Sequence, residues 1–211
     1  MTQNRFIQLC WGLVIMAFTV PFIAWLQNGG LSRGSLSIFS IFPLLGLWAW
    51  LLMWTHYITG SVRQHYGLER NVLYSKYTSW AVLVLILLHP SLITYKLFSI
   101  GEGLPPGSVI NYVGEAQKIS YLFGTLALLI FLSYEVFKRL KDRDFVKNNT
   151  HIISISQAVG MILIFVHALR LGNHLDPGWF KIFWIMCGLV LVPAMAYLID
   201  KDIHKVRSRG R

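Results

Sequence analysis

The sequence has 211 residues, of which 55% are hydrophobic and 13% are charged, and its mean hydropathy is +0.55. Soluble domains carry about 25% charged residues, so this composition excludes an ordinary soluble protein. The formal net charge is +10, and the basic residues lie in short stretches between apolar runs. That distribution favours anionic lipid headgroups as the partner and argues against nucleic acid.

Six apolar runs are long enough to cross a bilayer, because a spanning helix needs about 20 apolar residues. Lipid offers no partners for open backbone groups, so each run is predicted to be a helix. The first run lacks a small-residue cleavage site and is expected to stay as a membrane anchor. No internal repeat is evident. We expect an all-α, six-helix transmembrane bundle in one domain over residues 1–211, with spans at about 6–26, 36–60, 77–99, 119–137, 152–171 and 179–199.

Lysine and arginine gather in the second and fourth connections and in the C-terminal tail, and the remaining connections are poor in them. The positive-inside rule therefore predicts that both termini are cytoplasmic, in a bacterial inner (cell) membrane. Tryptophans near the ends of runs are expected to anchor at the interfaces: Trp25, Trp54 and Trp179. Cys10 and Cys187 lie within apolar runs and are expected to be small buried thiols.

Two histidines are expected at one depth inside the membrane. His89 lies about 18 Å along the third helix and His167 about 22 Å along the fifth, at about 1.5 Å per residue, and these helices run in the same direction. Polar residues at such depth cost free energy and are functional candidates. Two imidazoles on separate helices can supply both axial ligands of one heme iron. The alternative is that each histidine hydrogen-bonds a carbonyl on the next helix.

Other side chains near these histidines are weaker candidates. Arg170 lies one turn beyond His167 and can pair with a heme propionate, or it is an interface arginine that extends toward water. His174 is an alternative ligand, a proton relay or a residue of a hydrated loop. Near the opposite end of the bundle, a second cofactor site would use His151 with His56 or His65.

Three stretches resemble the ferric reductase-like transmembrane domain, a superfamily of ferric reductases, NADPH oxidases and the heme-binding membrane subunit of the methionine sulfoxide reductase system. These stretches are GLWAWLLMWTHYITGSVRQHYGLERNVLYSKYTSWAVLVLILLHP, YLFGTLALLIFLSYEVFKRLK and HIISISQAVGMILIFVHALRLG. The resemblance implies that His89 and His167 are the axial ligands of a b-type heme. Two-heme members carry a further histidine earlier on each helix, near Ser75 or Lys76 and near Ser154 here, where none occurs. One heme is therefore favoured, and the number stays open between one and two.

The resemblance also implies an electron-transfer role without a nicotinamide module. Only about a dozen residues follow Ile199, and no GxGxxG motif follows a strand. The electron donor would be a quinol, a bound flavin (FMN or FAD) or a separate reductase subunit. The acceptor would lie on the outer face, with a periplasmic redox partner as one candidate.

Two other functions stay open from the sequence. One is a proton or metal transporter or channel that uses the same histidines, although the runs hold almost no acidic residue at mid-depth. The other is a structural or assembly subunit without a cofactor. Gly124, in the fourth run, lets another helix approach closely in any of these cases.

Overall fold

The computed structural model describes residues 1–30, 37–140, 143–172, 175 and 178–209. Within these ranges every regular element is a helix, which confirms the all-α class. Six of the helices are long and apolar enough to cross a membrane, as predicted. They are α1 (Gln3–Gln27), α2 (Ile38–Tyr66), α3 (Val72–Ser99), α5 (Lys118–Arg139), α7 (Thr150–Leu171) and α8 (Gly178–Arg209).

The helices extend beyond the predicted apolar runs, mainly at one end of the bundle. α8 continues ten residues past Ile199, and α3 begins five residues before the predicted start at 77. The α8 extension is polar, and hydropathy does not detect a helix that projects into water. The connections between the long helices also hold short helices: α4 (Gly107–Val113), η1 (Glu115–Gln117) and α6 (Asp144–Asn148).

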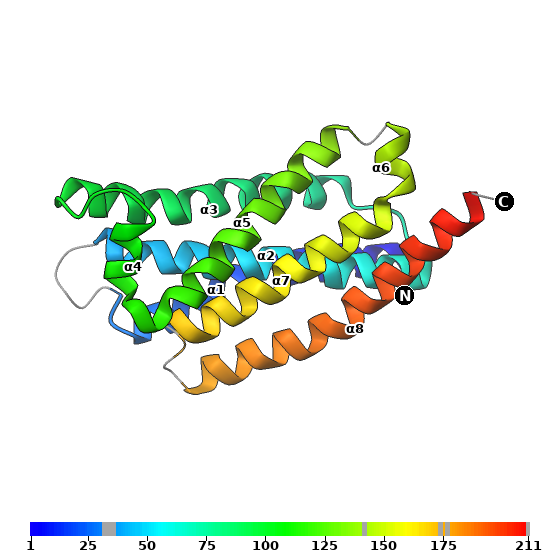
Figure 1. Ribbon diagram of the computed structural model, residues 1–211. Coiled ribbons are helices and arrows are strands. Elements are labelled where there is room, and N and C mark those ends of the chain that lie inside the picture. The colour runs from blue at the N-terminus through cyan, green and yellow to red at the C-terminus, as the bar shows by residue number, and fades with distance from the viewer. Residues whose placement is uncertain (31–36, 141–142, 173–174, 176–177, 210–211) are drawn as a thin grey trace.

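The six long helices lie side by side, so the bundle has two distinct ends (Figure 1). Both chain termini lie at one end, together with the end of α2 and the starts of α3 and α7. We call this the terminal end. The opposite end, with α4 and the starts of α2 and α5, is called the α4 end. Helices α3 and α7 therefore run in the same direction, as the sequence predicted.

Helix packing divides the bundle into two pairs and two flanking helices. α2 packs along α3 and α5 packs along α7, and these are the most extensive contacts in the described part of the chain. α1 lies on α2, and α8 contacts both α2 and α7. α2 is the most buried of the six helices, which makes it the centre of the bundle.

Tryptophan indoles of α2 connect this central helix to α7 and α8. Trp50 Nε1 donates to the Met161 carbonyl at 3.2 Å, and Trp54 Nε1 donates to the Cys187 carbonyl at 2.8 Å. The interfacial role predicted for Trp54 is therefore wrong, because its ring is buried in the core. Trp25 is also buried and donates to the Ser40 carbonyl, whereas Trp179 is exposed near the α4 end.

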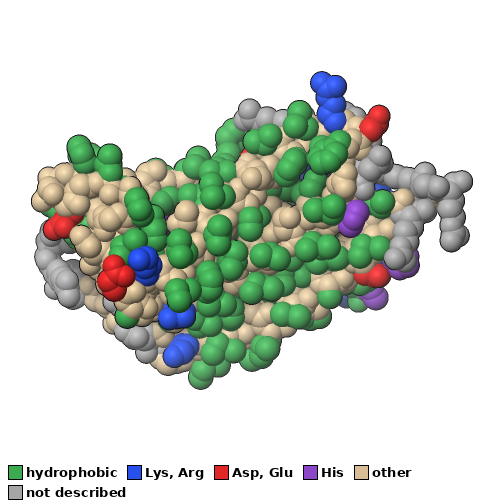
Figure 2. Space-filling model, in the orientation of Figure 1, with side chains coloured by type: hydrophobic (Ala, Val, Ile, Leu, Met, Phe, Trp, Pro, Cys, Tyr) green, Lys and Arg blue, Asp and Glu red, His purple; other side chains and the backbone are tan. Residues whose placement is uncertain are grey.

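The outer surface of the bundle is apolar along its length. Figure 2 shows hydrophobic side chains over the visible face, with charged side chains toward the two ends. Exposed leucines, isoleucines and aromatic residues occur on all six long helices. Such a surface is suited to a lipid bilayer. Cys10 and Cys187 are free and buried, as expected.

One local contact sets the start of α3 at the terminal end. The Asn71 side chain is the N-cap, and its Oδ1 accepts a hydrogen bond from the Tyr74 amide at 3.1 Å. We predict that Asn71→Ala lowers the free energy of unfolding by about 1 kcal/mol, because an N–H in the first turn of the helix loses its partner. Thermal unfolding in detergent followed by circular dichroism measures this. Asn71→Ser should retain most of the stability, and an equal loss in both variants would contradict the capping role.

Candidate functional site

His89 reaches from α3 to the backbone of α2. Its Nδ1 lies 2.6 Å from the Phe42 carbonyl oxygen, and the ring packs beside the Phe42 ring with centroids 5.4 Å apart. The same imidazole lies against Gly46 on α2. A Cβ added there would meet the His89 ring at 3.0 Å, which is closer than ordinary van der Waals contact. Gly46 therefore makes the space that the ring occupies.

His167 makes the same contacts between α7 and α5. Its Nδ1 lies 2.7 Å from the Ser120 carbonyl oxygen, and a Cβ on Gly124 would meet its ring at 2.8 Å. The close approach of another helix predicted at Gly124 is therefore present, and the approaching group is an imidazole. The sequence had not suggested a role for Phe42, Gly46 or Ser120.

The geometry of the receiving helices explains why a glycine accompanies each carbonyl. Phe42 precedes Gly46 by four residues, and Ser120 precedes Gly124 by four. Residues four apart lie on one face of a helix, one turn above the other. The missing Cβ lets the imidazole approach that face, so that it reaches the second lone pair of the carbonyl. A larger residue at either glycine would hold the ring away.

The two sites are related by an internal repeat of 78 residues, which the sequence analysis missed. Phe42, Gly46 and His89 correspond to Ser120, Gly124 and His167, and each histidine lies 47 residues after its carbonyl partner. The helix starts agree as well, since α3 begins at Val72 and α7 at Thr150. Identical pairs at this offset are Ile41/Ile119, Leu44/Leu122, Gly46/Gly124, Ala49/Ala127, Leu51/Leu129, Asn71/Asn149, Leu85/Leu163, Ile86/Ile164 and His89/His167.

The repeat places both histidines at one level of the bundle. Each lies 17 residues after the start of its helix, so the matched depth predicted from the sequence is confirmed. α3 has no extensive contact with α5 or α7 in the described part of the chain, so the two histidine-bearing pairs adjoin mainly through α2.

The remaining predicted site residues do not join this level. Arg170 is exposed in the last turn of α7, one turn beyond His167 toward the α4 end. His151 lies at the start of α7, where its Nδ1 is buried without a hydrogen-bond partner. His65 is exposed near the end of α2, and His174 lies outside the described residues. The possible second site of His151 with His174 therefore stays a prediction.

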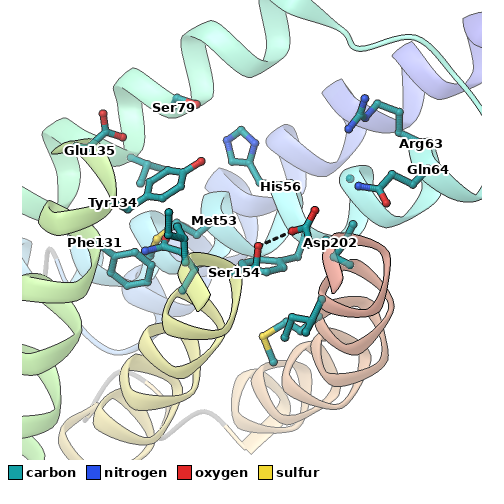
Figure 3. A pocket seen from close by; sticks show the side chains of 18 of the residues that line it. Met53, His56, Arg63, Gln64, Ser79, Phe131, Tyr134, Glu135, Ser154 and Asp202 are labelled. Carbon is teal, nitrogen blue, oxygen red and sulfur yellow. Dashed lines mark hydrogen bonds between the residues drawn. The ribbon is translucent and has the colours of Figure 1, made fainter. Parts of the chain in front are cut away.

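His56 lines a cavity of about 370 Å³ near the terminal end, between α2, α3, α5, α7 and α8 (Figure 3). We call it the terminal cavity. His56 enters from α2, Tyr134 from α5, and Ser154 donates a hydrogen bond to Asp202 at 2.5 Å beside it. Asp202 belongs to the polar extension of α8, which is why the sequence did not indicate it. Neither His89 nor His167 lines this cavity.

No protein family, curated protein or solved structure matches this chain. The comparisons therefore leave the resemblance to the ferric reductase-like domain untested. Among the described residues, no group of three or more His, Cys, Asp or Glu side chains is arranged to hold a metal ion. A heme needs only two axial ligands from the protein, so that finding concerns other kinds of metal site.

The two glycines give a direct test of the imidazole contacts. We predict that Gly46→Ala and Gly124→Ala each lower the free energy of unfolding by about 1–3 kcal/mol, because the added methyl group displaces a ring from its carbonyl. The loss should occur although alanine gains about 1 kcal/mol in helix propensity. Thermal unfolding in detergent measures this change.

Gly60→Ala is the matched control on α2. A Cβ at that position would meet its nearest neighbour, Leu198, at an ordinary 3.6 Å. The free energy of unfolding of Gly60→Ala should stay the same as that of the wild type or rise. If all three variants behaved alike, the glycines would not be needed for the histidine contacts.

Proposed function

We propose that this chain is a b-type heme membrane electron-transfer protein, with His89 and His167 as the two axial ligands. The observation that carries the proposal is the repeated pair of imidazole contacts at one level of the bundle. Each histidine uses Nδ1 to reach a carbonyl of the neighbouring helix, at 2.6 and 2.7 Å. Two equivalent imidazoles at one level form a donor set suited to one iron.

The hydrogen bonds fix the tautomer that such a role requires. A backbone carbonyl can only accept, so each Nδ1 must carry the proton. In the neutral imidazole the lone pair then lies on Nε2, which is the nitrogen that would bind iron. A hydrogen bond from the second ring nitrogen to a carbonyl is the usual support of a metal-bound histidine, since it fixes the ring and makes the ligand more basic. The residues present therefore fit the group.

A hydrogen bond to a backbone carbonyl is also expected if each histidine has only a structural role. Two observations favour the heme. The arrangement occurs twice at the same depth, and in both copies a glycine provides the space for the ring. A histidine that only connects two helices does not need a second histidine at the same level on another helix pair. A heme held by the two imidazoles would need both histidines at one level.

The chain's own residues would position and insulate the cofactor. α2 and α5 fix the ring planes through the Phe42 and Ser120 carbonyls, and the apolar helices exclude water. Arg170, one turn beyond His167, is placed to pair with a propionate at the α4 end. A heme with two axial nitrogen ligands has no open position, so it supplies one-electron transfer and does not bind oxygen.

The direction of electron flow follows from the positive-inside expectation. With both termini in the cytoplasm, the histidine level lies nearer the outer face, and the terminal cavity faces the donor side. The electrons would come from a quinol, a flavin or a separate reductase subunit and leave toward an acceptor outside. Proton or metal transport through the same histidines is the alternative, and flux into proteoliposomes without a pigment would favour it.

The axial ligands are tested by the absorption spectrum of the purified, reduced protein. We predict a six-coordinate b-type spectrum that is lost in His89→Ala and in His167→Ala, because each removes one of two iron ligands. His65→Ala is the control, since that histidine is exposed and distant from the level of the pair, and it should leave the spectrum unchanged. A colourless wild-type protein would contradict the proposal.

Arg170 is tested separately by redox titration. Arg170→Gln should keep the spectrum but lower the midpoint potential, because removing a nearby positive charge favours the ferric form. An unchanged potential would exclude the propionate contact.

A further inference from the structure

The terminal cavity is polar in a part of the bundle where polar groups are costly. Besides His56, Tyr134 and Gln157, it is lined by two arginines and two carboxylates. The cations are Arg63 and Arg70, and the anions are Glu135 and Asp202. Because these formal charges balance, the lining is suited to a neutral polar group better than to a phosphate.

A second hollow of about 470 Å³ adjoins the terminal cavity on the surface of α5 and α7. We call it the α5/α7 furrow. The two spaces share Tyr134, Ile153 and Gln157 in their linings. Most other furrow residues are aliphatic or aromatic, and several of them, such as Leu129 and Val159, are exposed on the apolar outer surface. The polar cavity thus adjoins an apolar hollow on the outer surface of the bundle.

We propose that the terminal cavity and the α5/α7 furrow together bind a lipid-soluble quinol, with the ring in the cavity and the apolar tail along the furrow. The inference rests on the proposed function and identifies the electron donor. A neutral ring with two hydroxyl groups matches the balanced, hydrogen-bonding lining. A long apolar tail matches the furrow and gives entry from the bilayer. A quinol also has the redox chemistry that an electron donor needs.

The cavity lies close to the proposed heme ligands. Ile86 lines it and precedes His89 by three residues on α3, which is about 4.5 Å along the helix axis. The same wall holds Met53 and Phe131, which correspond to each other in the 78-residue repeat, as do His56 and Tyr134. The donor site therefore lies between the two halves, next to the histidine level.

His56 lines the cavity and is hydrogen-bonded to Thr78. The Thr78 hydroxyl donates to the Tyr74 carbonyl at 2.6 Å, so at 2.9 Å it accepts from His56 Nε2. A quinol that is oxidised to its quinone releases two electrons and two protons. The two electrons would leave one at a time to the one-electron acceptor proposed above, and the two protons would be taken up at the polar lining, where His56 and Asp202 lie.

Binding of a decyl-substituted benzoquinone to the full chain in phosphatidylcholine nanodiscs tests the site without any redox readout. Titration calorimetry should give one saturable site. We expect His56→Leu and Gln157→Leu each to weaken binding roughly tenfold, through loss of a hydrogen bond to the ring. His65→Leu, on the same helix but outside the cavity lining, should bind as the wild type does. A benzoquinone without the tail should bind more weakly than the decyl form.

Three results would overturn the inference: no saturable binding, equal binding by all variants, or displacement of the quinone by anionic phospholipid, which would identify a lipid site. Unchanged melting temperatures would show that the variants fold. If His56→Leu does not fold, Gln157→Leu provides the test. A protein with the bis-histidine spectrum but no quinone binding would overturn only the donor site. A protein that binds quinone but carries no heme would overturn the proposed function instead.

Discussion

The central interaction is the hydrogen bond from a histidine Nδ1 to a backbone carbonyl on the neighbouring helix, made beside a glycine. It joins α3 to α2 through His89 and Phe42, and α7 to α5 through His167 and Ser120. Each bond places an imidazole inside an apolar bundle with its proton already assigned. The cost of burying a polar ring is reduced because one nitrogen has a strong acceptor. The other nitrogen is kept in the form that binds a metal.

The 78-residue repeat explains why this interaction occurs twice at one level. Two helix pairs of the same design adjoin mainly through α2. α1 and α8 have no counterpart in the repeat; α1 packs on α2, and α8 packs on both α2 and α7. Both halves also contribute residues to the wall of the terminal cavity. A single cofactor and its donor would both use this shared interface between the halves.

Hydropathy predicted the six spans because apolar length is a strong and local signal. The matched depth of His89 and His167 also followed from the sequence, since counting residues along two parallel helices gives their levels. The repeat did not, because its few identities are spread over long apolar stretches in which most residues are interchangeable. The recurring pattern of a glycine followed 43 residues later by a histidine is the signal that could have revealed it.

Features formed by several helices were beyond the sequence. Gly46 has no distinctive neighbours along the chain, and only the packing of α3 on α2 shows what occupies its face. Asp202 lies beyond the last apolar run, so its approach to Ser154 depends on a polar helical extension that hydropathy does not detect. Trp54 was predicted to lie at the interface because it is near the end of an apolar run. The helix continues for another three turns beyond it.

Electron paramagnetic resonance of the purified, oxidised protein tests the central claim most directly, because it reports how many strong ligands the iron has. Two imidazoles that bind through Nε2 predict a low-spin ferric signal from one heme per chain. A high-spin signal, or a protein without heme iron, would show that the two rings do not bind an iron between them.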